Sequence, residues 1–236
     1  EIRGVGEMYP LNGPSWSLFF EYIGNLLYAF LLRRLPTRAL AAWVALAGCG
    51  LAAFALWGPY GDICVGFALT EDNIVGGSLR LLFAFSAGLL LSRVFRPVAV
   101  RGAFWIGGLA IVAAAAVPRI GGSEHLWMNG LYDAFCAIML FPLIVYIGAS
   151  GRTTDRLTAR LCKFLGDISY PLYMVHYPFI YLYYAWVKNE GLTFAQSLPG
   201  AAALVAGSVL LAYLCLKLYD EPVRRLLTRR FLPTRR

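Results

Sequence analysis

The most constraining feature of this sequence is a series of apolar runs, each about 16–22 residues long, joined by short polar segments. A helix of that length spans the hydrocarbon core of a bilayer, which is about 30 Å thick. The composition agrees, because 59% of the residues are hydrophobic and 14% are charged, against about 45–50% and about 25% in soluble domains. The chain is therefore predicted to be an all-α, polytopic transmembrane helical bundle.

About seven membrane spans are predicted from these runs. They cover residues 14–32, 39–57, 78–95, 103–117, 131–147, 166–186 and 199–219. The fourth run is the shortest and is rich in alanine. Residues 14–219 are expected to form the spanning part of one membrane domain that covers 1–236, and residues 220–236 a basic cytoplasmic tail.

The charges of the connecting segments alternate in sign along the chain. The first connection carries Arg33, Arg34 and Arg38, whereas the second carries Asp62, Glu71 and Asp72. The third and fifth connections and the tail are again positive, while the fourth is negative and the sixth is balanced. Because short cytoplasmic loops carry the excess of Lys and Arg, the N-terminal end is predicted outside and the C-terminus in the cytoplasm. The net charge of +8 is thus explained without nucleic acid as a partner.

Two ionisable residues, Glu21 and Arg80, fall inside predicted spans, where a charge costs a few kcal/mol or more. Both lie toward the outer side, so an ion pair between them is geometrically possible. Either this pair is structural and joins two helices, or the two residues line a polar cavity. The five cysteines show no Cys-x-x-Cys spacing, so neither a disulfide framework nor a metal site is predicted.

His176 lies about 10 residues into the sixth predicted span, close to the middle of the bilayer. Tyr173, Tyr177 and Tyr184 recur near it at helical spacing, with Ser169 on the same side. We interpret this polar stripe as the lining of a cavity. A structural histidine and direct acid/base chemistry are the alternatives.

Prolines inside the predicted spans leave backbone carbonyls without their usual donors. Pro142, Pro171 and Pro178 free the carbonyls of the residues four positions earlier, which are Ile138, Asp167 and Met174. A plain helix kink is the default interpretation, and a functional role is the alternative. Residues 152–163 place Arg152, Arg156 and Arg160 on one helical face, which predicts a short interfacial helix on the cytoplasmic side.

Three motifs in the sequence resemble those of a known family. The segment W-S-L-F-F-E from Trp16 to Glu21 follows Asn12-Gly13-Pro14. It resembles the W-S-L-x-x-E motif of the acyltransferase 3 family of membrane O-acyltransferases. Residues 166–178, with the sequence G-D-I-S-Y-P-L-Y-M-V-H-Y-P, resemble its late G-x-x-S-Y-x-L-Y-x-x-H-x-P segment. Glu221-Pro222 resembles its closing acidic-proline element, and Arg80 before an apolar stretch also fits.

The resemblance implies a membrane enzyme of about ten spans that moves an acyl group, often acetyl from cytoplasmic acetyl-CoA, onto a glycan hydroxyl. The acceptor is implied to be a cell-surface or exported polysaccharide, as in exopolysaccharide biosynthesis, or a lipid-linked glycan, and the location the bacterial inner membrane. The present residues then correspond to the C-terminal part. The histidine and basic residues to which the family's catalysis is assigned are expected upstream, so this part alone is not expected to be active.

The resemblance also suggests roles for individual residues. The catalytic candidates are His176 and Glu21. The candidates for substrate binding are Trp16, Arg80, Tyr173 and Asn12. Arg152, Arg156 and Arg160 are candidates for holding the phosphates of acyl-CoA, against an alternative role as membrane anchors that contact lipid headgroups. The expected partners are the lipid bilayer, acyl-CoA and the glycan acceptor. The alternative functions are a glycan or lipid transporter or flippase, and a receptor.

The alternation of loop charges gives a testable topology. In a variant without the five native cysteines, single cysteines are introduced at polar loop positions and labelled with a membrane-impermeant reagent. We expect labelling only from the cytoplasm at Arg34, Arg96 and Arg156, and only from outside at Asp72, Glu124 and Glu190. Two successive connections on the same side would remove a predicted span.

Overall fold

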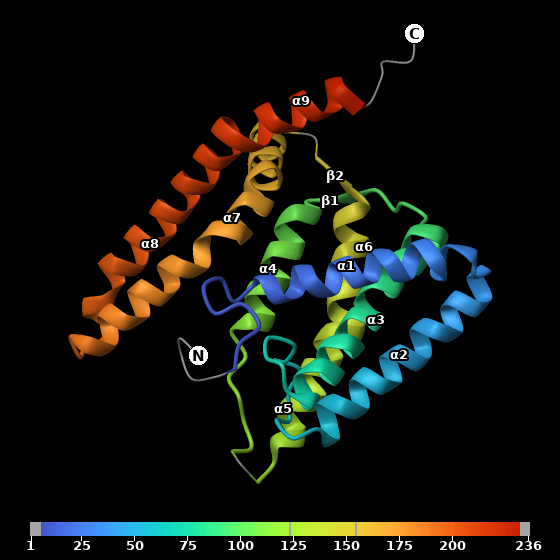
Figure 1. The fold of residues 1–236 in the computed structure, drawn as a ribbon. Coiled ribbons are helices and arrows are strands. Elements are labelled where there is room, and N and C mark those ends of the chain that lie inside the picture. The colour runs from blue at the N-terminus through green and yellow to red at the C-terminus, as the bar shows by residue number, and fades with distance from the viewer. Residues whose placement is uncertain (1–5, 123, 154, 232–236) are drawn as a thin grey trace. The chain divides into compact units, whose positions relative to one another are not determined.

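The computed structural model describes residues 6–122, 124–153 and 155–231, and it is mostly helical, at 77%. The chain divides into two compact units (Figure 1). The first unit comprises Glu1–Pro10 and Ser15–Asp155, and the second comprises Leu11–Pro14 and Arg156–Arg236. Residues 1–5 and residues 232–236 of the predicted basic tail lie outside the described part.

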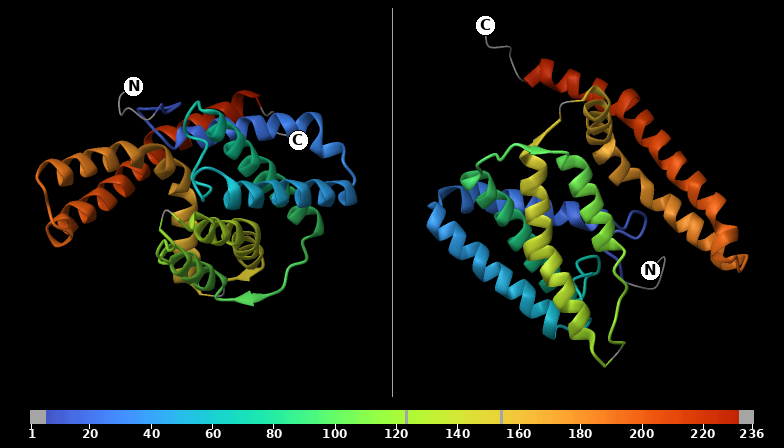
Figure 2. Two further views of the ribbon diagram at one scale, coloured as in Figure 1. Left: turned by 90° about the horizontal axis from the view of Figure 1, so that it is seen from below. Right: turned by 180° about the vertical axis from the view of Figure 1, so that it is seen from behind.

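The first unit is a helical bundle with a core of α2 and α3. Ala47 and Leu51 of α2 pack against Phe83 of α3, and α1 packs on α3, α5 on α2 and α4 on α6 (Figure 2). Its helices are α1 (Ser15–Phe30), α2 (Thr37–Trp57), α3 (Glu71–Val94), α4 (Ala103–Ala115), α5 (Leu126–Phe135) and α6 (Phe141–Ala149). Between them lie η1 (Leu32–Arg34), β1 (Val100–Arg101) and the π-helix η2 (Cys136–Leu140), and α6 is followed by β2 (Gly151–Arg152).

At one end of this unit, polar bonds join the first, third and fifth connections. Arg93 donates from Nη1 to the carbonyl of Leu35 at 2.6 Å and from Nη2 to that of Leu32 at 3.1 Å. The two-residue strands β1 and β2 pair in parallel, with Val100 opposite Gly151. Charge patterning did not predict these strands. These hydrogen bonds place the first, third and fifth connections at the same end of the unit. The alternation of loop charges predicts the same arrangement.

The opposite end of the unit joins the N-terminal segment to the second connection, and the second connection to the fourth. Met8 donates its backbone N–H to the carbonyl of Phe67 at 2.8 Å. Arg119 lies 3.5 Å from Asp62 and 3.4 Å from Asp133. The connections of the first unit thus alternate between its two ends.

The second unit is a helical hairpin followed by a basic helix. Helix α7 (Arg156–Asn189) packs along α8 (Phe194–Cys215), and the π-helix η3 (Leu216–Asp220) leads into α9 (Glu221–Phe231). The chain turns at Gly191, where φ is +60°. Gln196 Oε1 then accepts the backbone N–H of Thr193 at 2.9 Å, which satisfies one free donor at the start of α8.

Both π-helices end directly before a residue that is followed by proline. In each, the N–H of that residue bonds to the carbonyl five positions earlier: Phe141 to Cys136 before Pro142, and Glu221 to Leu216 before Pro222. Proline lacks an N–H, and its ring clashes with the carbonyl four residues back. A wider turn relieves that clash, so these prolines mark widened turns within continuous helices.

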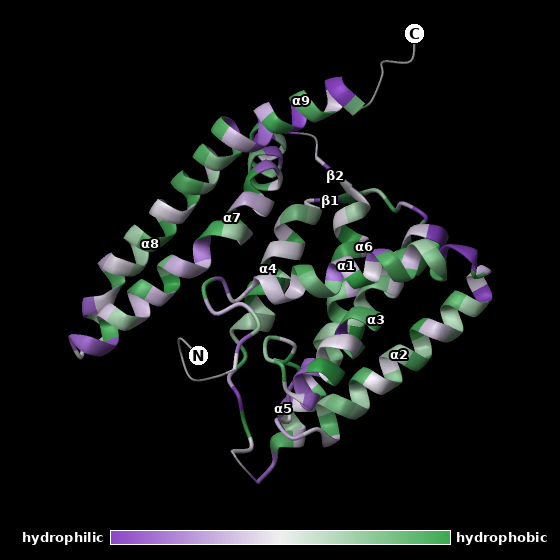
Figure 3. Cartoon of the chain, in the orientation of Figure 1, coloured by the Kyte–Doolittle hydropathy of each residue, from purple (hydrophilic) through white to green (hydrophobic). Residues whose placement is uncertain are grey.

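Four helices in the described residues are long and apolar enough to cross a membrane, namely Thr37–Trp57, Glu71–Val94, Leu126–Ala149 and Phe194–Phe231 (Figure 3). Helix α1 has 16 residues and α4 has 13. In α7, Tyr, His and Pro interrupt the apolar run. Four of the seven predicted spans therefore coincide with such helices, and the other three remain predictions.

The predicted interfacial helix over residues 152–163 is not a separate element. Arg152 belongs to β2, whereas Arg156 and Arg160 form the first turns of α7. The helix continues past residue 163 to Asn189, through Pro171 and Pro178. Helix α7 has 34 residues and is about 51 Å long, which exceeds the apolar core of a bilayer of about 30 Å.

The two bonds from Arg93 should contribute measurably to stability, because a charged donor bonds to one carbonyl of η1 and to that of Leu35, which directly follows η1. We expect Arg93→Met to cost about 2 kcal/mol, since hydrogen bonds to charged groups contribute about 1.5–3 kcal/mol. The midpoint of thermal unfolding in detergent should fall by about 4 °C or more. The control is Arg96→Met, which removes an exposed arginine of the same connection and should have little effect. An equal loss in both variants would contradict the prediction.

Candidate functional site

In the first unit, Arg80 and Trp16 form the centre of one polar cluster, which we call the Arg80 cluster. The guanidinium carbon of Arg80 lies 4.8 Å from the ring centroid of Trp16, within the range of a cation–π contact. Arg80 Nη1 also donates to the carbonyl of Val65 at 2.8 Å. The structure therefore brings together two of the predicted substrate-binding residues.

Asn73 fixes the loop that carries Val65. Its Oδ1 accepts the N–H of Gly66 at 3.0 Å, and its Nδ2 donates to Thr70 Oγ1 at 2.8 Å. Gly66 has φ of +110°, and a Cβ there would lie 2.5 Å from the Trp16 ring. Only glycine fits this close approach without strain, so Asn73 and Gly66 set the position of the loop under Trp16.

Sequence reasoning missed Asn73 and Gly66. Asn73 is 5% exposed, although it lies only two residues after the start of α3, among Glu71 and Asp72. Its signal in the sequence is the seven-residue spacing to Arg80, which places both residues on one face of the helix about two turns apart.

An apolar cavity of about 280 Å³ adjoins Arg80 in the same unit. Among the described residues that line it, Arg80 alone is charged. The cavity is lined by Leu51, Ile63, Arg80, Phe83, Ala84, Ala87, Gly88, Leu91, Ala137, Phe141, Pro142 and Val145.

The predicted ion pair between Glu21 and Arg80 is wrong. Within the described residues no ion pair joins them, and Glu21 is exposed. Glu21 lies five positions after Trp16 on α1, which turns it about 140° around the helix away from the side chain that contacts Arg80. A common depth along two helices does not bring two side chains together when they point in different directions around their helices.

In the second unit, the loop before α1 is bonded to α7 and forms what we call the His176 cluster. Asn12 Nδ2 donates to the carbonyl of Met174 at 3.0 Å. This is the carbonyl that Pro178 leaves without a helical donor. In return, the hydroxyl of Tyr173 donates to the carbonyl of Pro14 at 2.7 Å.

Gly13 lets this loop lie close against α7. A Cβ at Gly13 would be 2.8 Å from the Tyr181 hydroxyl oxygen and 2.9 Å from the Tyr177 ring, so a larger residue would push the loop away. The rings of Tyr177 and Tyr181 meet edge to face at 4.6 Å. Asn12 and Tyr173, both predicted to bind substrate, are thus brought together by the segment that precedes the W-S-L-F-F-E motif.

The orientation of His176 is set by backbone carbonyls. Its Nδ1 lies 2.9 Å from the carbonyl oxygen of Leu172 and 3.0 Å from that of Tyr173. Carbonyls only accept, so Nδ1 carries the proton and, in the neutral ring, Nε2 is left as an acceptor. Among the described residues, Nε2 of His176 and the buried Oδ1 of Asn12 have no hydrogen-bond partner.

The predicted polar stripe on α7 is only partly correct. Tyr173 and Tyr177 flank His176, with ring centroids 6.1 and 5.7 Å from it. Tyr184 is 64% exposed, and Ser169 is exposed with its hydroxyl donating to the carbonyl of Gly166. Tyr181, which was not predicted, joins the cluster because it lies one helical turn after Tyr177.

The basic residues predicted to bind acyl-CoA fall into different units. Arg152 lies in β2 of the first unit, and Arg156 and Arg160 lie one turn apart on α7 of the second. All three are exposed.

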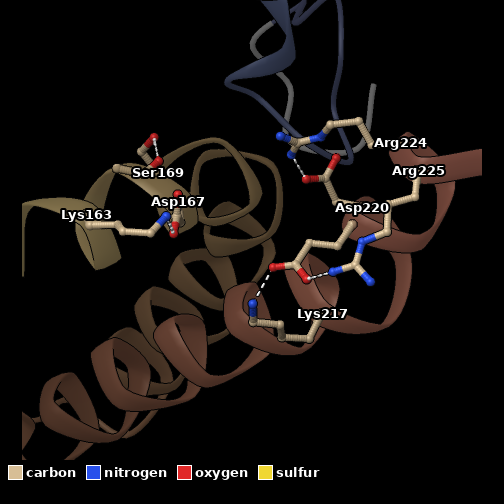
Figure 4. A network of polar contacts seen from close by, with 9 residues as sticks. Lys163, Asp167, Ser169, Lys217, Asp220, Arg224 and Arg225 are labelled. Atoms are coloured by element: carbon tan, nitrogen blue, oxygen red, sulfur yellow. Dashed lines mark hydrogen bonds and ion pairs between the residues drawn. The ribbon is translucent and has the colours of Figure 1, made fainter. Parts of the chain in front are cut away.

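Acidic residues pair with other cations of the second unit (Figure 4). Glu221 bridges Lys217 and Arg225, while Asp220 pairs with Arg224 and Asp167 with Lys163. The acid of the Glu221-Pro222 element therefore links η3 to α9 through ion pairs one helical turn apart.

Several long apolar helices indicate a multi-pass membrane protein. The family model described as an acyltransferase domain, acyltransferase 3, matches residues 4–217. This chain belongs to the acyltransferase 3 family. Comparison with curated proteins and with solved structures gives no significant match.

The bond from Asn12 to Met174 gives a test by double-mutant cycle. Asn12→Ala should lower the free energy of unfolding by about 1 kcal/mol, because a partly buried carbonyl loses its donor. In a Pro178→Ala background, the new N–H at position 178 can bond to Met174, so the same substitution should cost less. Thermal unfolding in detergent measures all four proteins. Additive effects would show that Pro178 is not the reason why Met174 needs Asn12.

Proposed function

We propose that this protein transfers an acyl group from acyl-CoA to a hydroxyl of a cell-surface or exported polysaccharide, or a similar glycan, at the bacterial inner membrane. Membership of the family supports acyl transfer in general. The acyl donor, the glycan acceptor, the O-acyl specificity and the cytoplasmic C-terminus are parts of the proposal. The requirement for residues upstream of this sequence is also part of it.

The observation that carries the proposal is the pair of unpartnered acceptors in the His176 cluster. A glycan hydroxyl is a hydrogen-bond donor. Among the described residues the buried Oδ1 of Asn12 lacks a donor, and Nε2 of His176 can accept one. Their positions are fixed in advance, because Asn12 is held through its Nδ2 and His176 through its Nδ1. A site of this kind binds a hydroxyl with little loss of side-chain freedom.

In the proposed reaction, the acceptor oxygen attacks the thioester carbonyl, a C–O bond forms and the C–S bond breaks. The hydroxyl proton leaves the acceptor, and CoA departs as the thiol. His176 Nε2 accepts the hydrogen bond of the hydroxyl and orients its lone pair. Negative charge develops on the carbonyl oxygen as the C–O bond forms, so the reaction also needs a hydrogen-bond donor there.

Two further assignments rest on the motifs and on charge. Glu21 stays a catalytic candidate because of its place in the W-S-L-F-F-E segment. Arg156 and Arg160 are proposed to hold the phosphates of acyl-CoA at the inner surface, with polysaccharide outside and the bilayer between. Arg152 is also positively charged and exposed, and it remains a candidate for the same role.

Substitution of His176 distinguishes a proton carrier from a residue that holds the hydroxyl. In membranes supplied with acyl-CoA inside and glycan acceptor outside, ester formation should be lost in His176→Ala and in Glu21→Gln. Glutamine keeps an acceptor oxygen but cannot titrate near neutral pH, so we expect His176→Gln to retain much of the activity. Direct acid/base chemistry would instead lower the rate about 10²-fold or more in both His176 variants.

The matched control is His125→Gln, because His125 is the other histidine and is exposed at the start of α5. Its ester formation should equal that of the unsubstituted protein. Movement of the glycan or lipid without any ester product, with the donor supply confirmed, would instead favour a transporter or flippase.

A further inference from the structure

The cavity beside Arg80 is lined along one face of α3. Arg80, Ala84, Gly88 and Leu91 line it, and these positions cover about 16 Å of helix. Ala137 of the π-helix η2 and Pro142 of α6 also line it. The cavity is open along α3, because Ala84 and Gly88 are exposed.

This combination of shape and charge indicates the chemistry of the occupant. Apolar walls favour hydrocarbon, and a cation at one end favours an oxygen-bearing head group. An apolar cavity of about 150 Å³ holds one benzene ring. At about 280 Å³, this cavity has room for a single chain of roughly ten carbons, far more than an acetyl group requires.

Arg80 lies nine residues after Glu71, the first residue of α3, and so about 14 Å along the helix from its end. It is two residues into the predicted span 78–95, so the carbonyl of an acyl chain can meet it near the outer end of that span. A phospholipid in the cavity is the competing occupant, and it would leave no preference for decanoyl-CoA over acetyl-CoA. A second apolar groove, of about 600 Å³ on α2 and α3, has no charged residue in its described lining and therefore specifies no head group.

We infer that the cavity binds the acyl chain of the donor, with its carbonyl at Arg80, and that the chain transferred has about eight to twelve carbons. This rests on the proposed acyl transfer and replaces acetyl, which the family resemblance implies, with a longer group. Trp16 of the W-S-L-F-F-E motif contacts the same arginine, so the carbonyl end of the chain lies beside a family motif.

Gly88 offers a way to shorten the cavity without disturbing the fold. It lies in the wall of the cavity, and a Cβ added there meets nothing within 4 Å. A leucine at this position fills part of the space for the chain. Gly108 of α4 is the matched control, because it is also helical, exposed and free of neighbours within 4 Å, but it does not line the cavity.

The experiment measures binding of radiolabelled decanoyl-CoA and acetyl-CoA to the protein in nanodiscs of uncharged lipid, without acceptor. We expect the unsubstituted protein and Gly108→Leu to bind decanoyl-CoA about tenfold or more tightly than acetyl-CoA, since each buried methylene adds affinity. Gly88→Leu should lose about tenfold in decanoyl-CoA affinity while its acetyl-CoA affinity changes by less than about twofold.

Equal affinities for the two donors in the unsubstituted protein would overturn the inference, as would equal losses in the two leucine variants. A second outcome would also overturn the inference. If free decanoate displaces decanoyl-CoA, and the protein forms an acetyl ester but no decanoyl ester, then the occupant of the cavity is a fatty acid from the bilayer. If the chain preference depends on Gly88 but no donor gives an ester, the chain site stands and the proposed transfer fails.

Discussion

A membrane helix must satisfy its backbone carbonyls within the protein, because lipid offers no hydrogen bonds. Prolines break this rule locally, and the chain restores it in two ways. Before Pro142 and Pro222 the helix widens to a π turn, so that the residue before each proline still donates. At Pro178 the helix keeps its α form, and Asn12, 162 positions before Met174 in the sequence, supplies the missing donor. The first solution shapes the cavity wall at Pro142, and the second builds the His176 cluster, so both candidate sites depend on how a proline is accommodated.

The connections of the first unit are tied at their ends by different chemistry. At one end a guanidinium and two short strands bind backbone carbonyls and amides, and at the other an arginine lies between two aspartates. Each of these hydrogen bonds, and the ion pair of Arg119 with Asp62, joins two connections that have two passes of the chain along the bundle between them, so both connections lie at the same end of the bundle. Polar bonds at the ends of a bundle cost little desolvation, because water and lipid head groups reach them. The interior can then stay apolar around Arg80.

Much of the fold follows from the sequence, since long apolar runs and loop charges depend on local composition. The release of the Met174 carbonyl by Pro178 was also predictable, as a local rule about proline. Its partner was not, because Asn12 reaches α7 only through tertiary structure. Glu21 shows a second limit, since depth along α1 was predictable but the direction around α3 that Arg80 takes, toward Trp16 and Val65, was not. The widened turn at Pro142 was expected as a plain kink, because nothing in a single proline distinguishes a kink from a π turn. The strands β1 and β2 are too short to leave any periodic signal.

The His176 cluster and the Arg80 cluster differ in hydrogen-bonding character, and each lies in its own unit. In the second unit, Nε2 of His176 and Oδ1 of Asn12 accept, which suits a hydroxyl that must give up a proton. In the first unit, the guanidinium of Arg80 can only donate, which suits an oxygen that carries negative charge. A carrier that only moves a glycan meets the same hydroxyls on both sides of the membrane and has no electrophile to stabilise. An apolar cavity beside a cation has a clear use in the transferase, where it holds the chain of the group that reacts. It has none in the passage of a glycan, whose many hydroxyls would be desolvated there at a cost of about 1–3 kcal/mol each.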